Sequence, residues 1–468
     1  MLDLDADLST LRGADYNPRH ISEADLADLG QSIATLGLVK PLIVRGDLLV
    51  AGHQRTRALR LLGIERAAVY RLAAETTVYD EVRFNQLHNG TDLDAGDEAA
   101  RIEGGFAAPG WHVVEATRLR ANFRGALATV RDEIATMINK FGPWGAVVAS
   151  LDGQVIHAAQ YALAAFLTGS PLTVHVLPDD KIAYARAMLG RDYGVFSYDG
   201  LERHTYIQTL AQMSRLRPGP SGKANKSTLY ETMAIPFALA NPASRFIDFG
   251  SGQGDYASAL RRRGLQFHDV ELFRRGASNA LDWRTIAGMI DKLAADLTEH
   301  GQYDATVCDS VLNSVDSLSA EFAVMTTLNA LTKIGGRVFI SGRPAERNEA
   351  AARYTKRVDA KSRRAVEFLD ANGFTAIFRA GHWFYQKFHW RADIAPLCER
   401  FGLQVDRHAH GGNSWQVSAT KVAELPRESV ESALKFEFDI SLGDNRSLGR
   451  DGDMIEAYRS SMRPAGLR

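Results

Sequence analysis

Cysteine, long apolar runs and metal-binding histidine patterns are scarce in this sequence. Only two of its 468 residues are cysteines, Cys308 and Cys398, which excludes a disulfide framework or a thiolate metal site and suits a reducing cytoplasm. No apolar run reaches about 18 residues, and no charged-then-apolar segment follows Met1, so the pattern argues against membrane spanning and secretion. The 13 histidines show no H-x-x-x-H or H-E-x-x-H spacing, and we predict no protein-bound metal.

Charge and length bound the remaining possibilities. The net charge is −1, so any nucleic-acid contact has to come from local basic patches. With 45% hydrophobic and 24% charged residues the composition is that of a folded globular protein, and a chain of this length predicts roughly three domains.

The most informative stretch covers residues 246–257. An apolar run ends in Asp248, and Gly250, Gly252 and Gly254 follow at alternate positions before a helix-forming segment. Such a strand, turn and helix lets the backbone bend sharply and presents helix amides to a ligand. Dinucleotide sites and structural turns share this spacing, but a carboxylate at the strand end would repel a pyrophosphate and hold a cation. The stretch resembles motif I of class I S-adenosylmethionine (SAM) methyltransferases.

The segments that follow fit the same kind of domain. Glu271 ends an expected second strand, where an acid can accept the ribose hydroxyls of the cofactor. Asp282 and Trp283 would suit an adenine amino group and ring face, with a surface Asp and a core Trp as the alternative. The resemblance spans residues 244–422. It implies SAM as cofactor, bound by Asp248, Gly250, Gly252, Gly254, Glu271, Asp282, Trp283 and Asp309.

A further strand pattern ends in Asp309, and Asn313 follows it in the next segment. Ligands of open α/β sheets lie beyond the carboxyl ends of the strands, so we expect Asp309 and Asn313 beside the reactive methyl group as the candidate catalytic residues. The acid-Pro-Pro-aromatic tetrapeptide of exocyclic-amine DNA methyltransferases is missing, as is the Pro-Cys of cytosine-C5 enzymes. Cys308 should face away from Asp309 and is expected to be a buried structural thiol.

The amino-terminal region contains an anion-binding pattern. An expected helix capped by Ser22 and a hairpin precede the segment Gly52-His53-Gln54-Arg55-Thr56-Arg57, which opens a second helix. Backbone amides and guanidinium groups at a helix start can share phosphate oxygens. Residues 11–72 resemble the ParB/sulfiredoxin-like domain, in the form fused to bacterial and phage DNA methyltransferases. The resemblance implies a nucleotide or phosphate site at Asn17, Arg19, Gly52, His53, Gln54, Arg55 and Arg57, with a nucleoside triphosphate as candidate ligand.

Two departures qualify this resemblance. His53 stands where ParB partition proteins usually carry a glutamate, which puts CTP hydrolysis in doubt. It also stands where sulfiredoxins carry their cysteine, which excludes that reductase activity. A DNA-docking module whose arginines hold only phosphate is the alternative.

A shift of 105 residues lays one helix–hairpin–helix pattern over another, with Leu29 and Ile33 falling on Ile134 and Ile138. We therefore predict residues 128–177 as a second, degenerate copy of the first unit, a chance match being the alternative. At the phosphate site Gly52, His53, Arg55 and Arg57 align with His157, Ala158, Gln160 and Ala162. The second copy would then serve as a packing partner.

Two segments could contact a nucleic acid. A basic stretch predicted as a helix contains Arg353, Lys356, Arg357, Lys361 and Arg363, and a solvated helix face is its alternative. An aromatic stretch at residues 381–390 includes Trp383 and Tyr385, which could stack an extruded base or pack in a core.

The predicted fold class is α/β, with an N-terminal ParB/sulfiredoxin-like α+β unit, a degenerate second copy and a C-terminal Rossmann-like methyltransferase domain. The predicted divisions are 1–90 for the ParB-like domain, 111–217 for the degenerate repeat and connector helices, 218–243 for a Gly- and Pro-rich linker, 244–422 for the methyltransferase domain and 423–468 for a peripheral tail.

Taken together, the patterns predict a SAM-dependent methyltransferase that modifies DNA, with the ParB-like region engaging DNA or a nucleotide. DNA is the expected partner, no membrane is expected, and a homodimer stays open. Two alternatives remain. One is a nucleotide-gated DNA-binding protein whose SAM fold is a scaffold. The other is a SAM-dependent enzyme that transfers another group or acts on RNA or a small molecule.

Overall fold

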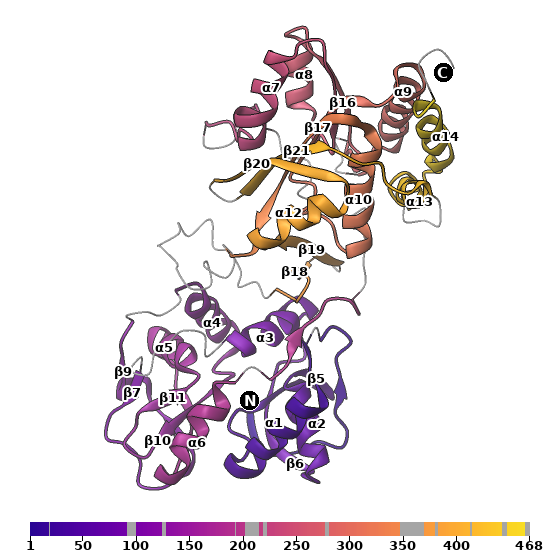
Figure 1. Ribbon diagram of the computed structural model, residues 1–468. Helices are drawn as coiled ribbons and strands as arrows, with labels where there is room; N and C mark the ends of the chain where they lie inside the picture. Colours follow the sequence, from indigo (N-terminus) through magenta and orange to yellow (C-terminus); the bar gives the residue numbers. More distant parts are fainter. Residues whose placement is uncertain are drawn as a thin grey trace. The chain divides into compact units, whose positions relative to one another are not determined.

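The computed structural model describes residues 1–17, 19–90, 100–123, 128–191, 193–201, 215–218, 222–276, 280–346, 369–379, 382–411, 414–441 and 447–463. The chain divides into two compact units, one formed mainly by Met1–Leu201 and the other by most of the chain from residue 202 onward (Figure 1). The predicted basic helix with Arg353, Lys356, Arg357, Lys361 and Arg363 lies outside the described residues. No helix in the described ranges is long and apolar enough to span a bilayer.

The first unit contains one α/β motif twice. The first copy consists of β1 (Leu2–Asp7), α1 (Glu23–Leu36), β4 (Leu42–Arg45), β5 (Leu48–Ala51), α2 (His53–Leu61) and β6 (Arg66–Arg71). The second copy consists of β8 (Gly110–Val114), α4 (Ala128–Phe141), β10 (Ala146–Ser150), β11 (Val155–His157), α5 (Ala159–Thr168) and β12 (Leu172–Leu177). The sheets run β1-β6-β4-β5 and β8-β12-β10-β11, with the same parallel and antiparallel pairs. The two copies therefore share one topology, as the repeated hydrophobic pattern predicts.

The remaining elements of the first unit are short strands and connecting helices. They are β2 (Arg12–Gly13), β3 (Arg19–His20), α3 (Val78–Gly90), β7 (Ala100–Ile102), the 3₁₀ turn η1 (Ala116–Arg118), β9 (Leu119–Ala121), α6 (Asp179–Leu189) and β13 (Val195–Phe196). One hydrophobic core joins the two copies, because Ile43, Val50 and Phe84 pack with residues of the second copy such as Val147 and Leu163. The second copy thus packs against the first through a shared core.

The two motifs align with a different offset at their second helices. Gly52 caps α2 with a φ of 99°, and Ala158 caps α5 with a φ of 63°, so both caps are left-handed and lie 106 residues apart. The predicted alignment of Gly52 with His157 is therefore wrong by one residue. In this register Arg55 and Arg57 correspond to Tyr161 and Leu163, so the second copy lacks both arginines, whereas Gln54 corresponds to Gln160.

The second unit is built on a mixed eight-stranded sheet. Its strands are β14 (Arg245–Phe249), β15 (Gln266–Val270), β16 (Tyr303–Asp309), β17 (Thr332–Pro344), β18 (Phe374–Arg379), β19 (His382–His389), β20 (Leu403–Gly411) and β21 (Ser414–Lys421). Strands β15, β14, β16 and β17 are parallel in that order, and antiparallel β21 lies between β17 and β20. Strand β19 pairs with the carboxyl end of β17.

The order of the strands creates a switch point. From β14 the chain proceeds to β15 on one side and then returns to β16 on the other side of β14. Connections leave the carboxyl ends of β14 and β16 in opposite directions, and ligands of open α/β sheets bind in the crevice at such a point. The carboxyl ends of these two strands are therefore where a site is expected.

Helices cover this sheet. They are the π-helical turn η3 (Tyr230–Ala234), α7 (Ile235–Ala240), α8 (Asp255–Arg261), α9 (Trp283–His300), α10 (Leu318–Leu331), α12 (Arg391–Arg400), α13 (Arg427–Phe438) and α14 (Asp451–Ser461). Part of the predicted linker 218–243 is thus helical, and Tyr230 and Met233 pack in one core with Phe246 and Phe267.

The predicted peripheral tail also differs from the structure. Helix α13 packs against α10 and α14 packs against α9 (Figure 1). Val430, Leu434 and Phe438 are at most 1% exposed, and Met454 of α14 is fully buried. The polar composition of this region hides apolar residues that recur every three or four positions, which is the spacing of one buried helix face.

Candidate cofactor-binding site

The turn after β14 depends on three glycines with left-handed backbone. Gly250, Gly252 and Gly254 have φ values of 80°, 59° and 68°, a region that favours glycine. The buried residues Phe246 and Phe249 hold β14 in the sheet, and α8 begins directly after the turn. The segment is therefore the strand, turn and helix that its sequence predicts.

Two of these glycines make room for the protein itself. A Cβ atom on Gly250 would clash with Val311 in the loop after β16, and one on Gly254 would lie 3.0 Å from Oδ2 of Asp269 on β15. The space that the missing side chains open at these positions is thus filled by neighbouring strands and loops. Close packing of the turn explains these glycines without a ligand.

Glu271, directly after β15, is fixed by the glycine turn. Its Oε2 accepts a hydrogen bond from the Gly252 amide at 2.7 Å, and its Oε1 accepts one from the Phe273 amide at 2.9 Å. The residue is 3% exposed, and burial raises its pKa to about 7 despite these two bonds. Each carboxylate oxygen keeps a second lone pair, so the group is oriented and can still accept hydroxyl donors.

Acidic side chains gather at the carboxyl ends of three adjacent strands. Burial raises the pKa of Asp248 well above its ordinary value; the nearby Tyr230 phenol opposes this rise, and the charges of Asp269, Asp309 and Glu271 add to it. Like charges at close range are unfavourable unless a cation is present. The cluster therefore suits a positively charged ligand, as predicted for Asp248.

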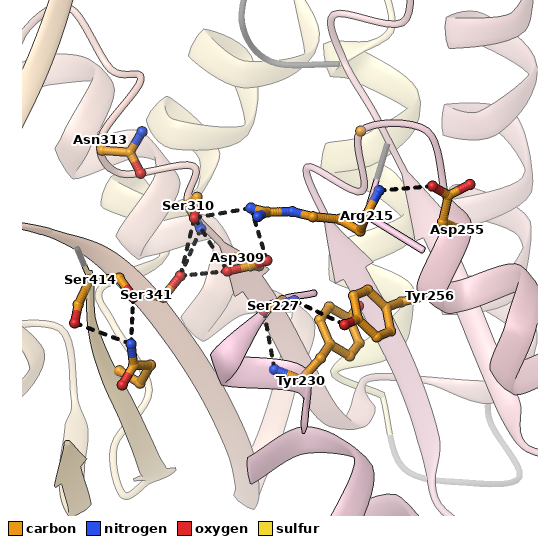
Figure 2. Close-up of polar contacts among 12 residues, drawn as sticks. Arg215, Ser227, Tyr230, Asp255, Tyr256, Asp309, Ser310, Asn313, Ser341 and Ser414 are labelled. Carbon is orange, nitrogen blue, oxygen red and sulfur yellow. Dashed lines mark hydrogen bonds and ion pairs between the residues drawn. The ribbon is translucent and has the colours of Figure 1, made fainter. Parts of the chain in front are cut away.

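Asp309, the last residue of β16, is held from two sides (Figure 2). Its Oδ1 accepts a hydrogen bond from Ser341 Oγ at 2.6 Å, and its Oδ2 forms an ion pair with Nη2 of Arg215 at 3.2 Å. Ser310 follows with a φ of 66°, and its amide donates to Ser341 Oγ at 2.9 Å. A non-glycine residue in this region is strained, and such strain is concentrated at functional sites.

Residues 215–217 are a part of the site that the sequence pattern did not reveal. The Arg215 amide donates to Oδ2 of Asp255 at 2.9 Å (Figure 2). Nε of Arg217 lies 3.4 Å from Oδ1 of the same carboxylate. Asp255 is the first residue of α8, so the segment is fastened where the glycine turn ends. These arginines were predicted to belong to a connector, because their neighbours in space are distant along the chain.

A pair of tyrosines supports the same corner. The rings of Tyr230 and Tyr256 stack with centroids 4.1 Å apart and nearly parallel planes. The Tyr256 hydroxyl accepts a hydrogen bond from the Ser227 amide at 2.9 Å (Figure 2). It also donates one to Glu231 at 2.9 Å. Tyr230, which also affects the pKa of Asp248, was not among the predicted site residues.

Asn313, Asp282 and Trp283 occupy loops and helix starts around the sheet edge. The carbonyl of Asn313 accepts a hydrogen bond from the Lys387 amide at 3.2 Å. Asp282 caps α9 by accepting the Thr285 amide at 3.2 Å, and its own amide donates to the carbonyl of Arg274 at 2.8 Å. Trp283 is 48% exposed, so the alternative of a core tryptophan is wrong.

Asp282 is connected to the glycine turn through one arginine. The Arg274 side chain donates from Nη1 to the carbonyl of Gly252 at 2.5 Å. The structure thereby brings the loop before α9 to the same turn that holds Glu271. Asp248, Glu271, Asp309 and the glycines are grouped as predicted, and Asp282 adjoins them.

Three residues considered at the sequence level are buried. Cys308 is fully buried, and burial raises the pKa of its thiol, in agreement with a structural role. Trp383 and Tyr385 on β19 are 7% and 3% exposed. Core packing therefore accounts for these aromatic residues in this structure. Among the described residues, no three His, Cys, Asp or Glu side chains are placed to share a metal ion.

At the predicted phosphate site in the first unit, the side chain of Arg55 bonds to protein groups. Arg55 donates from Nη1 to the Lys40 carbonyl at 2.7 Å and from Nη2 to His88 at 2.9 Å, and burial lowers its pKa to about 10. A Cβ atom on Gly52 would lie 2.6 Å from the Leu42 side chain. The guanidinium group of Arg55 therefore bonds to the unit's own interior.

The other predicted phosphate ligands also contact protein groups. Nε2 of His53 accepts a hydrogen bond from the Ala14 amide at 3.1 Å, and burial lowers the His53 pKa to about 4. Arg19 donates to the carbonyls of residues 193 and 194 at 3.3 Å, and its own carbonyl accepts from Gln54 and Asn17. Arg57 pairs with Glu23 at 3.2 Å on the surface. The structure thus brings Asn17, Arg19 and Gln54 together, with their polar groups in mutual contact.

Comparisons with known proteins assign a domain to each unit. Residues 210–408 match the family model of a methyltransferase domain, and residues 4–82 match that of the ParB N-terminal domain. No curated protein matches the chain.

Several solved structures are similar to part of this chain. The CcbJ methyltransferase from Streptomyces caelestis is 12% identical with a TM-score of 0.32, covering 47% of this chain and 100% of its own. The 1,6-didemethyltoxoflavin-N1-methyltransferase from Burkholderia thailandensis, with S-adenosylhomocysteine (SAH) bound, is 14% identical with a TM-score of 0.28, covering 42% and 78%. The magnesium protoporphyrin IX methyltransferase from Synechocystis PCC 6803, also with SAH, is 15% identical with a TM-score of 0.26, covering 42% and 82%.

Proposed function

We propose that this chain, a SAM-dependent methyltransferase domain preceded by a ParB N-terminal domain, transfers a methyl group from SAM to DNA. The observation that supports SAM as the cofactor is the acid cluster at the switch point of the sheet, which consists of Asp248, Glu271 and Asp309. The observation that supports the acceptor is the combination of domains, since this ParB-like form resembles the one fused to DNA methyltransferases.

The residues at the switch point fit SAM chemically. Glu271 is oriented by two backbone amides and keeps lone pairs for the two ribose hydroxyls. Asp248 and its acidic neighbours favour a positive ligand, whereas a pyrophosphate would be repelled. Trp283 is exposed next to Asp282 and offers an aromatic face for an adenine ring.

The protein's part in the reaction is to orient the acceptor toward the methyl group of SAM. When bound, SAM supplies an electrophilic methyl group on a positively charged sulfur. The acceptor's lone pair forms the new bond to the methyl carbon. At the same time the carbon–sulfur bond breaks and its electron pair goes to sulfur. An amine acceptor then loses its proton to solvent. Fixing the two reactants in line can lower the barrier of such a reaction by about 7–11 kcal/mol. Asp309 and Asn313 are the residues proposed to lie beside the acceptor.

A small-molecule acceptor is the second candidate. The segment after β16 reads Asp309-Ser310-Val311-Leu312 and lacks the acid-Pro-Pro-aromatic tetrapeptide. In addition, Trp383 and Tyr385 are packed in the core, so they do not present free faces to an extruded base. Both observations favour an acceptor other than a base of DNA.

The decisive experiment follows a labelled methyl group. Purified protein is incubated with methyl-tritiated SAM and, separately, with genomic DNA, total RNA or a small-molecule extract, and digested nucleosides are identified by mass spectrometry. We expect label and a mass gain of one methyl group in a deoxynucleoside. Asp248→Asn/Glu271→Ala protein is the control and should transfer none. Label in RNA or in the extract, with none in DNA, would overturn the DNA assignment and favour the second candidate or an RNA substrate.

A further inference from the structure

The guanidinium group of Arg215 is only partly used. Nη2 contacts Oδ2 of Asp309 at 3.2 Å and Oγ of Ser310 at 3.3 Å. Its Nε and Nη1 atoms have no partner among the described residues. Nε and Nη1 do not share an edge, because Cδ lies between them, but each can donate a hydrogen bond to an anion. Arg215 therefore neutralises Asp309 and retains capacity for a second anion.

The position of this arginine is determined by the backbone beside it. The amides of Arg215 and Leu216 both donate to Oδ2 of Asp255, at 2.9 and 3.5 Å, and Arg217 adds an ion pair to the same carboxylate. Leu216 also packs against the hydrophobic core of the second unit. Residues 215–217 are thus fastened to the start of α8, which pre-organises the guanidinium group at the sheet's carboxyl edge.

The chemistry of the pair matches an α-amino acid. In such a group an ammonium and a carboxylate are joined through one carbon, so a receptor needs an acid and a base side by side. Asp309 and Arg215 provide these at 3.2 Å, with side chains that are 11% and 23% exposed. They lie next to the glycine turn, where the methionine part of SAM would lie if Glu271 holds the ribose.

We propose that Arg215 binds the α-carboxylate of SAM and of its product, and that Asp309 binds the neighbouring α-ammonium group. This inference rests on the proposed binding of SAM. It assigns Asp309 to the cofactor and leaves Asn313 as the residue beside the acceptor. The Arg215–Asp309 pair would then hold the amino-acid end of the cofactor while Glu271 holds the ribose.

The test compares ligands with and without the amino-acid group. SAH and 5′-methylthioadenosine, which lacks that group, are titrated calorimetrically into wild type, Arg215→Met and Arg215→Lys protein. Losing a hydrogen-bonded ion contact costs about 1.5–3 kcal/mol, so SAH should bind Arg215→Met about 10- to 100-fold more weakly. 5′-Methylthioadenosine should bind both proteins alike, and Arg215→Lys should recover part of the SAH affinity. Arg217→Met, on the same segment and more exposed, is the matched control and should bind SAH nearly as wild type does.

Each other outcome overturns the proposal in a recognisable way. Tighter SAH binding by Arg215→Met would mean that Arg215 competes with the ligand for Asp309. Equal weakening of both ligands would mean that Arg215 only supports the fold. Wild-type protein alone provides a second test, because decarboxylated SAM should bind it about tenfold or more weakly than SAM. Failure of wild type to bind any of these ligands would instead refute the cofactor proposal.

Discussion

Glu271 is the residue whose ionisation should control cofactor binding. Burial raises its pKa to about 7 in the ligand-free protein. A neutral carboxyl group donates one hydrogen bond and is a weaker hydrogen-bond acceptor than a carboxylate. Two ribose hydroxyls that both donate to Glu271 therefore require its ionised form. Binding should therefore release a proton below about pH 7, and SAH affinity should rise as the pH increases from 6 to 8.

The measurement is calorimetric titration of SAH in buffers of different ionisation enthalpy. Proton release should disappear in Glu271→Gln, which cannot titrate. Proton release that persists unchanged in Glu271→Gln would locate the titration elsewhere, and Asp248→Asn would test the other acid with a raised pKa.

The raised pKa of Glu271 also has a consequence for folding, because the folded state holds the proton more tightly than the unfolded chain does. The contribution of Glu271 to stability should decline as the pH rises from about 4.5 to about 7.

Single residues differ in how far the sequence could identify them. Asp248, Glu271 and Asp309 end apolar strand patterns, and parallel strands bring their carboxyl ends to one edge, so a local pattern was enough. Arg215 could not be predicted, because its partners Asp255 and Asp309 are distant along the chain. Arg55 shows the reverse case. Its place at a helix start predicted a phosphate ligand, yet the carbonyl of Lys40 and His88 take up its donors.

At the scale of elements, the sequence predicted the internal repeat better than it predicted where helices begin and end. Apolar spacing identified the second copy of the first unit, because hydrophobic positions survive where polar ligands do not. The one-residue error at Ala158 arose because a left-handed alanine cap replaces the glycine that would have marked the helix start. Helix α13 was missed for another reason, since the average polarity of residues 423–468 conceals a regular apolar face.

Helix α13 should contribute to the stability of the second unit. Phe438 is fully buried, with its ring 6.5 Å from that of Phe249 at the end of β14, whereas Phe436 on the same helix is 45% exposed. Phe438→Ala should lower the free energy of unfolding by about 3–5 kcal/mol, because it removes a large buried ring and leaves a cavity. Phe436→Ala should change it by only about 0.5 kcal/mol. Urea denaturation of the two variants measures both values, and equal small effects would show that α13 is peripheral after all.

At the scale of the molecule, the chain holds two compact units with separate hydrophobic cores. A ligand stabilises only the folded structure that binds it, so SAH should act on the second unit. At about 100 times its dissociation constant it should add about 2.7 kcal/mol, which raises the corresponding unfolding temperature by several degrees. The transition of Met1–Leu201 should stay where it is.

Differential scanning calorimetry of the full chain, repeated with variants, can assign each unfolding transition to one of the two units. Arg55→Met removes buried hydrogen bonds of the first unit, so it should lower only the transition that SAH leaves unchanged. Adding a nucleoside triphosphate then reports on the ParB-like region, because a ligand bound there would raise that same transition. If SAH raised both transitions of the wild type by similar amounts, the two units would be energetically coupled. Occupancy of the methyltransferase domain would then be communicated to the ParB-like region, and the two could not be treated as independent modules.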